Sequence, residues 1–197
     1  MIDEATDFSV KPTLIGAKVI LRPFVADDLP LMRVVLDDPE VITLTGSEGS
    51  AATPQATLEN WYTTRNDQTD RLDLAVVDKA TGECVGEVVL NDWDEHNRSA
   101  GFRTLLGPNG RGRSLGTDAV RLIVGYGFEQ LHLHRISLEV YAFNPRARRA
   151  YEKVGFVPEG VLRDALRHGD GWVDATVMSI LDHEWVRHRG MPAAADH

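Results

Sequence analysis

Three short apolar segments joined by tight connections constrain the fold of this chain more than any other feature. Residues 72–78 and 84–92 flank a Lys-Ala-Thr-Gly stretch at 79–82, which is typical of a hairpin turn because glycine tolerates a positive φ angle. A polar loop then leads to a third segment of the same kind, residues 100–106. Strands connected this closely pair in antiparallel fashion, so the sequence predicts an antiparallel sheet in the middle of the chain.

Strand and helix patterns alternate along the remainder of the 197 residues. Strands are predicted at residues 19–24, 136–141, 157–167 and 172–181, helices at 29–36, 53–65, 117–131 and 144–154, and a loop at 43–52. This order favours an α/β (α+β) fold in which helices cover both faces of a mixed, mostly antiparallel sheet. No linker or repeat divides the chain, so we expect a single domain over residues 1–197 with its core at about 18–185 and loose ends.

The charge balance limits the partners that the protein can bind, and the single cysteine excludes an internal disulfide. The chain has 21 Lys and Arg against 30 Asp and Glu, a net charge of −9, which argues against a nucleic-acid partner. Cys84 cannot form an internal disulfide, and its place in a strand predicts a buried, inert thiol. The N-terminus does not resemble a signal peptide and no run of about 18 apolar residues occurs, so we expect a cytoplasmic protein without a membrane span.

A glycine-rich segment between a strand and the strongest predicted helix is the first candidate site. It reads Arg111-Gly112-Arg113-Ser114-Leu115-Gly116-Thr117. Small residues allow the backbone to approach a ligand closely, and amide groups at a helix start, together with two arginines, favour a phosphate. A tight turn with solvated arginines is the alternative interpretation of this segment taken alone. Neither a Walker loop nor a dinucleotide fingerprint is present, because Gly-Lys-Ser/Thr and Gly-x-Gly-x-x-Gly are both missing.

A second segment, from Asn144 to Phe156, begins a helix and carries several arginines. It reads Asn-Pro-Arg-Ala-Arg-Arg-Ala-Tyr-Glu-Lys-Val-Gly-Phe. Taken alone, Asn144 is a helix cap and Tyr151 is a half-buried packing residue. Three arginines of this segment are expected to contact either the phosphates of a ligand or water: Arg146, Arg148 and Arg149.

In their order and spacing, the two segments together resemble the GNAT superfamily of acetyl-CoA-dependent N-acetyltransferases. The family's pyrophosphate loop is Gln/Arg-x-x-Gly-x-Gly/Ala, and Arg111-x-x-Ser114-x-Gly116 matches it except at Ser114, where glycine is usual. Residues 144–156 are similar to the family's Asn-x-x-Ala-x-x-x-Tyr-x-x-x-Gly-Phe signature without a break. The resemblance covers residues 18–185, most of the chain.

The resemblance extends to a branch of the superfamily at both ends of the chain. Leu-Arg-Pro-Phe at residues 21–24, followed by two aspartates, and Trp-Val-Asp at residues 172–174 look like the branch that contains ribosomal-protein N-terminal acetyltransferases. This similarity says little about the acceptor. The loops at residues 43–52 and 168–171 are expected to shape the acceptor pocket, but their sequences do not identify a ligand.

The resemblance implies where acetyl-CoA binds. It implies a V-shaped splay between the strands at 100–106 and 136–141, with the pantetheine arm in the gap against backbone groups near Leu105 and Leu106. It also implies that the pyrophosphate meets the amides of residues 111–117 and that Asn144 hydrogen-bonds the arm. Ser114 departs from the pattern, and its Cβ narrows the loop and restricts positive φ, so weaker cofactor binding than with glycine is expected.

The resemblance further implies direct transfer of the acetyl group to a primary amine in a ternary complex. Tyr151 is expected to face the thioester sulfur and to protonate the departing thiolate. An alkyl ammonium, with its pKa near ~10.4, needs about 4.6 kcal/mol to become neutral at pH 7, so a carboxylate base acting through water is expected. Glu87 is the first candidate because its strand resembles the one preceding the acetyl-CoA strand, and Asp92 is the second. The alternative for each residue is a carboxylate that is exposed to water at the end of a strand and has no role in catalysis.

Two classes of function remain open at this point. The chain is either an N-acetyltransferase or a catalytically silent acyl-CoA-binding regulatory module on the same fold. For the enzyme, the expected partner is an amine, either a protein N-terminus or a small molecule such as an antibiotic or a polyamine, and a homodimer is left open. No metal is expected, because His132 and His134 lack a third ligand at the usual spacing.

Overall fold

The computed structural model describes residues 7–48 and 53–189. Eight strands form one sheet in the order β1-β2-β3-β4-β5-β6-β8-β7, and every neighbouring pair is antiparallel except β5 and β6. The strands are β1 (Leu14–Ile15), β2 (Val19–Arg22), β3 (Leu72–Asp78), β4 (Cys84–Asp94), β5 (Ser99–Leu106), β6 (Arg135–Tyr141), β7 (Val157–His168) and β8 (Gly171–Leu181).

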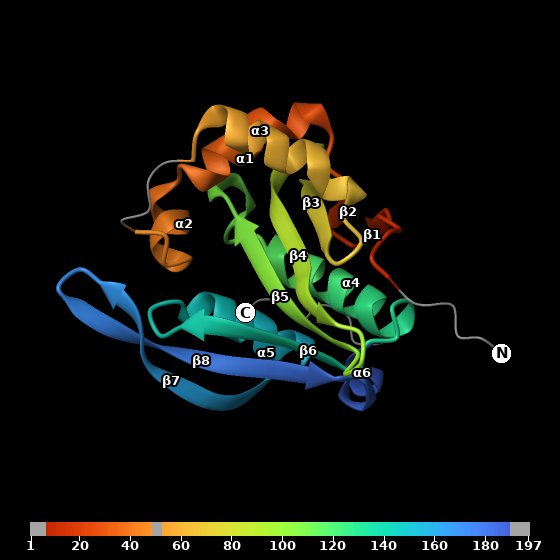
Figure 1. Ribbon diagram of the computed structural model, residues 1–197, viewed down its shortest axis with the longest axis vertical. Helices are drawn as coiled ribbons and strands as arrows, with labels where there is room; N and C mark the ends of the chain where they lie inside the picture. Colours follow the sequence, from red (N-terminus) through yellow and green to blue (C-terminus); the bar gives the residue numbers. More distant parts are fainter. Residues whose placement is uncertain (1–6, 49–52, 190–197) are drawn as a thin grey trace.

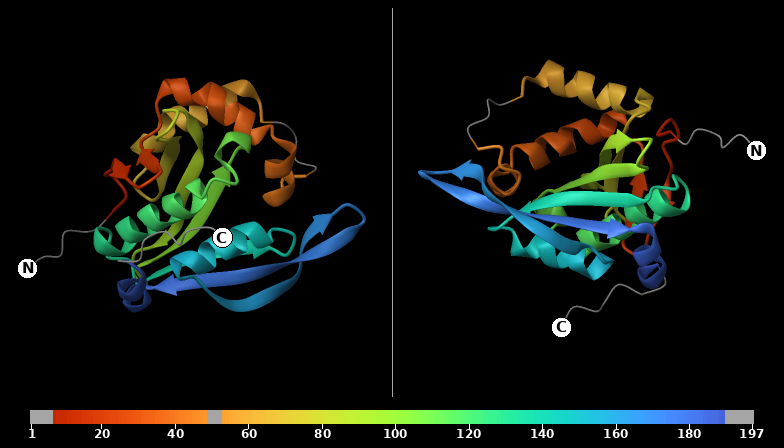
Figure 2. Two further views of the ribbon diagram at one scale, coloured as in Figure 1. Left: turned by 180° about the vertical axis from the view of Figure 1, so that it is seen from behind. Right: turned by 60° about the horizontal axis from the view of Figure 1, so that its bottom comes forward.

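Helices cover both faces of this sheet, as the sequence predicted (Figure 1). The α-helices are α1 (Leu29–Leu36), α2 (Pro39–Leu44), α3 (Gln55–Thr64), α4 (Leu115–Glu129), α5 (Pro145–Val154) and α6 (Asp182–His188). Helices α1 and α3 lie together on one side, while α4 and α5 pack against each other on the opposite side (Figure 2). None of the helices among the described residues is long and apolar enough to cross a membrane.

The core is divided by the sheet into two apolar clusters. The larger one joins α4 to the inner strands through residues such as Leu74, Val88 and Ile123, all of which are fully buried. The smaller one lies under α1 and includes Met32, Leu105 and Cys84. The Cys84 sulfur lies 3.8 Å from that of Met32, and burial raises the pKa of its thiol to about 12, which agrees with an inert role.

The parallel strands β5 and β6 part from each other soon after they meet. They pair only where residues 99–101 face residues 135–137. Beyond that point β5 stays with β4 as far as Leu106, and β6 stays with β8 as far as Tyr141. Each strand therefore keeps a partner on its outer side, and the V-shaped splay that the resemblance implied is confirmed.

Two helices were missed by the sequence analysis, and one began later than predicted. Helix α2 lies partly inside the predicted loop 43–52, and its start has an ordinary signal: the Asp38 carboxylate accepts a hydrogen bond from the Val41 amide over 3.0 Å, and Pro39 follows it. Residues 49–52 of the predicted loop lie outside the described residues. Helix α6 was also unexpected. Helix α3 begins at Gln55, two residues later than predicted.

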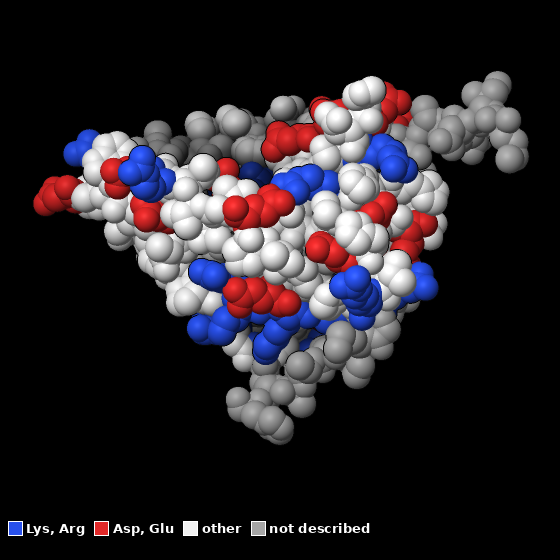
Figure 3. Space-filling view, turned by 90° about the horizontal axis from the view of Figure 1, so that it is seen from below, with Lys and Arg blue, Asp and Glu red and all other residues white. Residues whose placement is uncertain are grey.

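The face of the molecule on the β7–β8 side carries charges of both signs. Lys and Arg lie next to Asp and Glu across this surface, and no wide area of positive charge covers it (Figure 3). Arg135 and Glu159 form one of these ion pairs, and the hydrogen bonds from Arg135 and Ser179 lower the pKa of Glu159 to about 2. On this face the acidic and basic side chains largely neutralise each other.

Candidate active site

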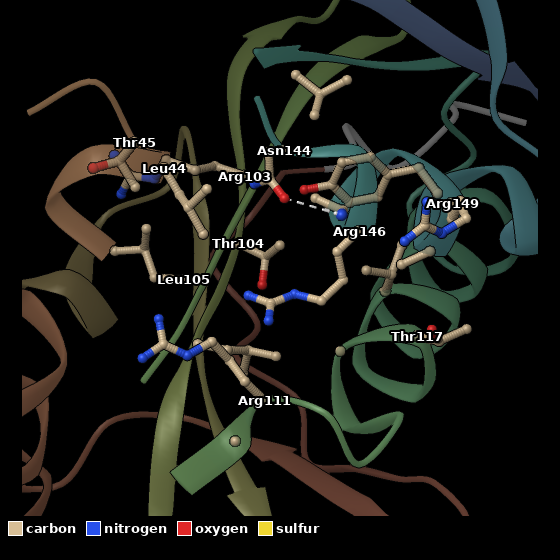
Figure 4. A pocket seen from close by; sticks show the side chains of 18 of the residues that line it. Leu44, Thr45, Arg103, Thr104, Leu105, Arg111, Thr117, Asn144, Arg146 and Arg149 are labelled. Atoms are coloured by element: carbon tan, nitrogen blue, oxygen red, sulfur yellow. Dashed lines mark hydrogen bonds between the residues drawn. The ribbon is translucent and has the colours of Figure 1, made fainter. Parts of the chain in front are cut away.

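A cavity of about 500 Å³ occupies the gap between the splayed strands. Its walls come from β5, β6, the glycine-rich loop with the start of α4, one side of α5, and the end of α2 (Figure 4). The strand edge of β5 beyond Gly101 has no partner on the β6 side, so its backbone groups are open to the cavity. Leu105 and Leu106, which were predicted to border the pantetheine arm, both line it.

The glycine-rich loop turns into α4 through two residues with left-handed backbone angles. Gly112 has φ +73° with nothing near the position of a Cβ, whereas Ser114 adopts φ +61° directly before the helix begins at Leu115. A serine in this region carries strain that glycine does not. The structure therefore confirms that the backbone at position 114 needs a positive φ angle, which the Cβ of serine disfavours.

Most of the predicted loop residues border the cavity, and two side chains do not. The lining includes Arg111, Gly112, Ser114, Gly116 and Thr117. The Arg113 side chain instead pairs with Asp78 over 2.5 Å, and that of Leu115 is buried in the core. At these two positions, only the backbone groups remain as candidates for contact with the pyrophosphate.

Arg111 and Arg146 approach the cavity from different elements and are both bound to α2. Arg111 donates a hydrogen bond from Nη2 to Oδ1 of Asp38 over 2.8 Å, and its Nη1 lies 3.1 Å from Oε2 of Glu40. Arg146 on α5 reaches the other oxygen of Glu40 over 2.8 Å. Burial opposes ionisation of Asp38, but hydrogen bonds from the Val41 amide and Arg111 outweigh it and lower the pKa of this carboxyl. Carboxylates of α2 thus bind cations from two walls of the cavity.

The second sequence segment forms α5 and faces the cavity with its predicted residues. Oδ1 of Asn144 accepts a hydrogen bond from the Ala147 amide over 3.1 Å and caps the helix, which ends at Gly155 with φ +116°. Asn144 and Tyr151 both line the cavity. Of the three arginines of the segment, Arg146 and Arg149 line it as well, while Arg148 pairs with Glu152 instead.

Tyr151 combines a packed ring with a place in the lining of the cavity. Its ring meets Phe102 edge to face at 5.9 Å and also contacts Phe156, and the residue is only 7% exposed. Burial raises the pKa of the phenol, so it keeps its proton at neutral pH. Among the described residues, none hydrogen-bonds to this hydroxyl, which leaves it able to donate to a ligand.

The two candidate bases lie apart from each other and outside the cavity lining. Glu87 is buried and accepts hydrogen bonds from the Tyr62 hydroxyl at 3.1 Å and from Arg103 Nη2 at 3.2 Å. Burial raises the pKa of the Glu87 carboxyl, against the opposing influence of Arg103. Asp92 sits at the paired end of the splay, beside Gly101. The side chain of Arg103 lines the cavity and contacts Glu87, so it lies between Glu87 and the cavity. Among the described residues, none in the cavity lining connects Asp92 to the cavity in this way.

Several residues of the cavity were not found by the sequence analysis. They come from strands and from the missed helix, where single side chains carry no motif: Val41, Arg103, Glu139 and Tyr141. Leu44 and Thr45 also line the cavity, and they belong to the segment 43–52 that was expected to shape the acceptor pocket. The Asp38-Pro39 helix start was a readable signal for Val41. Nothing local distinguishes Arg103 or Glu139 from any exposed strand residue.

The groups that border the cavity suit a CoA thioester. Nη1 of Arg111 is buried and lies 3.1 Å from Oε2 of Glu40 without forming a hydrogen bond, and Gly112 offers an open backbone next to it. An anionic group can satisfy both, because arginine and free amides are the usual ligands of phosphate. An open strand edge then continues along β5 toward Tyr151. These features define the class of acyl-CoA-dependent transferases.

Comparison with known proteins identifies the family. The acetyltransferase (GNAT) domain model matches residues 18–157, and the chain belongs to this family. Spermidine N(1)-acetyltransferase of Escherichia coli strain K12 is 29% identical over 175 residues, which are 88% of this chain and 91% of that protein. The putative ribosomal N-acetyltransferase YdaF of Bacillus subtilis strain 168 is 31% identical over 104 residues, which are 53% and 57% of the two chains.

A solved structure supports the same assignment. Spermidine N-acetyltransferase from Vibrio cholerae in complex with CoA and spermine superposes with a TM-score of 0.78 at 25% identity, covering 86% of this chain and 99% of that one. The protein is therefore an acetyl-CoA-dependent N-acetyltransferase with the fold that the sequence predicted.

Proposed function

We propose that the protein transfers the acetyl group of acetyl-CoA directly to a primary amine in a ternary complex. The observation that carries this proposal is the cavity in the splay, because it brings a neutral tyrosine hydroxyl and an open strand edge to one space. Acetyltransferases that are named for the amine spermidine are among the relatives. Direct transfer needs both substrates in one space, and the cavity, which is lined by elements from both faces of the sheet, is proposed to hold them together.

The cofactor is assigned to the α4 and α5 side of this cavity. Arg111, the amides of residues 112–117 and Arg146 are proposed to hold the pyrophosphate, and Asn144 the pantetheine arm. The backbone of Leu105 and Leu106 is proposed to run beside the arm as a neighbouring strand does. Ser114 has a left-handed backbone conformation that glycine adopts without strain. The loop is therefore expected to bind the pyrophosphate less tightly than it would with glycine at this position.

The chemistry assigns one proton donor and one proton acceptor to the chain. The amine nitrogen attacks the thioester carbon, the carbon–sulfur bond breaks, and Tyr151 gives its proton to the sulfur. The ammonium loses one proton to become nucleophilic, and Glu87 is proposed to accept it through water, since its raised pKa makes it a stronger base than an ordinary carboxylate. The nitrogen loses a second proton as the amide forms, and this proton replaces the one that Tyr151 gives to the sulfur. Asp92 is the second candidate, although its place at the closed end of the splay favours Glu87.

Release of free CoA thiol tests the proposal. The purified chain is given acetyl-CoA and a set of amines that includes small molecules and N-terminal peptides. Thiol release that depends on the amine supports the enzyme. Binding of acetyl-CoA without release for any amine would instead establish the alternative, a silent acyl-CoA-binding module. The homodimer and the cytoplasmic setting remain predictions.

A further inference from the structure

Two side chains of opposite charge stand at equivalent positions on the strands that part. The last paired residues of β5 and β6 are Gly101 and Ser137. Two residues further along each strand are Arg103 and Glu139, and both line the cavity. They do not form an ion pair with each other, because the strands have already separated at this level.

Both side chains point to the face of the sheet on which α2 lies. Side chains alternate along a strand, and Phe102, Leu138 and Val140 belong to the core under α4. Arg103 and Glu139 must therefore face the other way. The contact of Arg103 with Glu87, itself bonded to α3, agrees with this direction.

This face of the cavity is the one away from α4 and α5, which carry most of the proposed cofactor groups, although Arg111 and Arg146 reach across it to Asp38 and Glu40 of α2. Helix α2 contributes Leu44 and Thr45 to the lining there, and the next turn approaches β6, where Gly46 lies against the Tyr141 ring. The acceptor must enter from the side that the cofactor does not fill. Arg103 and Glu139 consequently border the path of the acceptor.

The two charges are available to a ligand. Among the described residues, none forms an ion pair or hydrogen bond with Glu139. Within the part of the chain that the structure describes, Arg103 has Glu87 as its one partner, over 3.2 Å, and its side chain remains 43% exposed.

We propose that the acceptor is a primary amine that also bears a carboxylate, with Glu139 attracting the ammonium and Arg103 binding the carboxylate. This inference rests on the function proposed above and names the acceptor class of the same site. A bidentate guanidinium is the usual partner of a carboxylate, and an opposite charge attracts the amine before it loses its proton. A polyamine offers Arg103 only further positive charge, which is repelled.

One pair of acceptors isolates the carboxylate. Lysine and cadaverine carry the same side-chain amine and differ by one carboxylate. We expect kcat/KM for lysine to exceed that for cadaverine by about tenfold or more, since a charged site discriminates against a ligand that leaves it unpaired. Peptides with Ala-Asp and Ala-Asn at the N-terminus form a second pair. A preference for Ala-Asp over lysine identifies a protein N-terminus as the source of the same chemistry.

Variants assign the effect to the two residues. Arg103→Gln should reduce the ratio of kcat/KM for lysine to kcat/KM for cadaverine about tenfold, and Arg103→Lys should restore much of the preference because it keeps the charge. Glu139→Gln should raise KM for both amines without changing acetyl-CoA affinity. Arg148→Gln is the matched control, since this arginine pairs with Glu152 outside the cavity. Thermal melting confirms that each variant is folded.

Each remaining outcome has a definite meaning. Equal or better use of cadaverine by the wild type would overturn the proposed acceptor class, as would an equal loss for both amines in Arg103→Gln. If no amine or peptide releases CoA at all, the proposed function has failed instead. The two failures are therefore distinguishable in one set of assays.

Discussion

Arg111 and Asp38 are joined by a 2.8 Å hydrogen bond that ties the glycine-rich loop to the first turn of α2. Glu40, on the same turn, lies between Arg111 and Arg146 and contacts both. The arginines proposed to hold the pyrophosphate are thus bound by carboxylates of the chain itself. A phosphate bound by these two arginines would compete with the carboxylates of Asp38 and Glu40.

Glu40→Gln is expected to tighten the binding of CoA. Removing one competing carboxylate leaves Arg111 and Arg146 more open to phosphate, and the gain is about two- to fivefold, as for a partly exposed ion pair. Calorimetry with CoA measures it. Pantetheine, which lacks the phosphates, should bind both proteins equally. Asp37→Asn is the control, because this exposed carboxylate pairs with Arg33 outside the cavity. A similar gain in CoA affinity for this variant would mean that the change in net charge alone explains the result.

Ser114→Gly is expected to relieve the left-handed strain at the start of α4. The conformation costs a serine about 1 kcal/mol, partly offset because glycine is more flexible when unfolded. The free energy of unfolding should therefore rise by less than about 1 kcal/mol, and KM for acetyl-CoA should change by less than about tenfold. Ser114→Ala removes the hydroxyl but retains the strain. A change of several hundredfold in KM for Ser114→Gly would mean that the loop holds phosphate differently.

Tyr151→Phe is expected to lower turnover about 100-fold while acetyl-CoA affinity and melting temperature hardly change. The substitution keeps the ring contacts with Phe102 and Phe156 and removes only the proton. Tyr151→Ala should in addition lose about 3–5 kcal/mol of stability, because it empties the core. Near-normal turnover in Tyr151→Phe would make this residue a packing group only, with the acid elsewhere. Steady-state kinetics and thermal melting separate the two cases.

Glu87→Gln is expected to change how activity and stability depend on pH. If Glu87 is the base, activity of the wild type rises as pH passes the raised pKa of this carboxyl, and the variant loses that acidic limb. An unchanged profile would assign the role to Asp92 or to water alone.

The stability of the same variant follows from the direction of the pKa shift. The folded-state pKa lies above the ordinary value of 4.5, so the folded protein favours protonated Glu87. The stabilisation from this group is present below pH 4.5 and is lost as pH rises through the raised pKa. Glutamine does not ionise, so the free energy of unfolding of Glu87→Gln, measured with denaturant, should rise relative to that of the wild type as pH increases from about 4.5 through the raised pKa. A constant difference across this range would contradict the shift.

Local signals account for the parts that the sequence predicted correctly. The Asn144 cap, the glycine at the end of α5 and the alternation of β6 each depend on residues a few positions apart. For the same reason α2 was predictable in principle, since Asp38-Pro39 is a helix start, but its six residues carry too short an apolar pattern to stand out in a polar region. Short elements depend on tertiary packing for their stability.

The sequence by itself determined the family, the mixed sheet with helices on both faces, and the two segments that line the cavity, because motifs and periodicities are properties of neighbouring residues. Only the tertiary structure decided which charges meet. Asp38 and Arg111 lie 73 positions apart, and their ion pair exists because α2 lies beside the loop before α4. Arg103 and Glu139 face the same space because β5 and β6 pair over three residues and then diverge. Coulomb attraction depends on distance in space, which sequence separation does not measure.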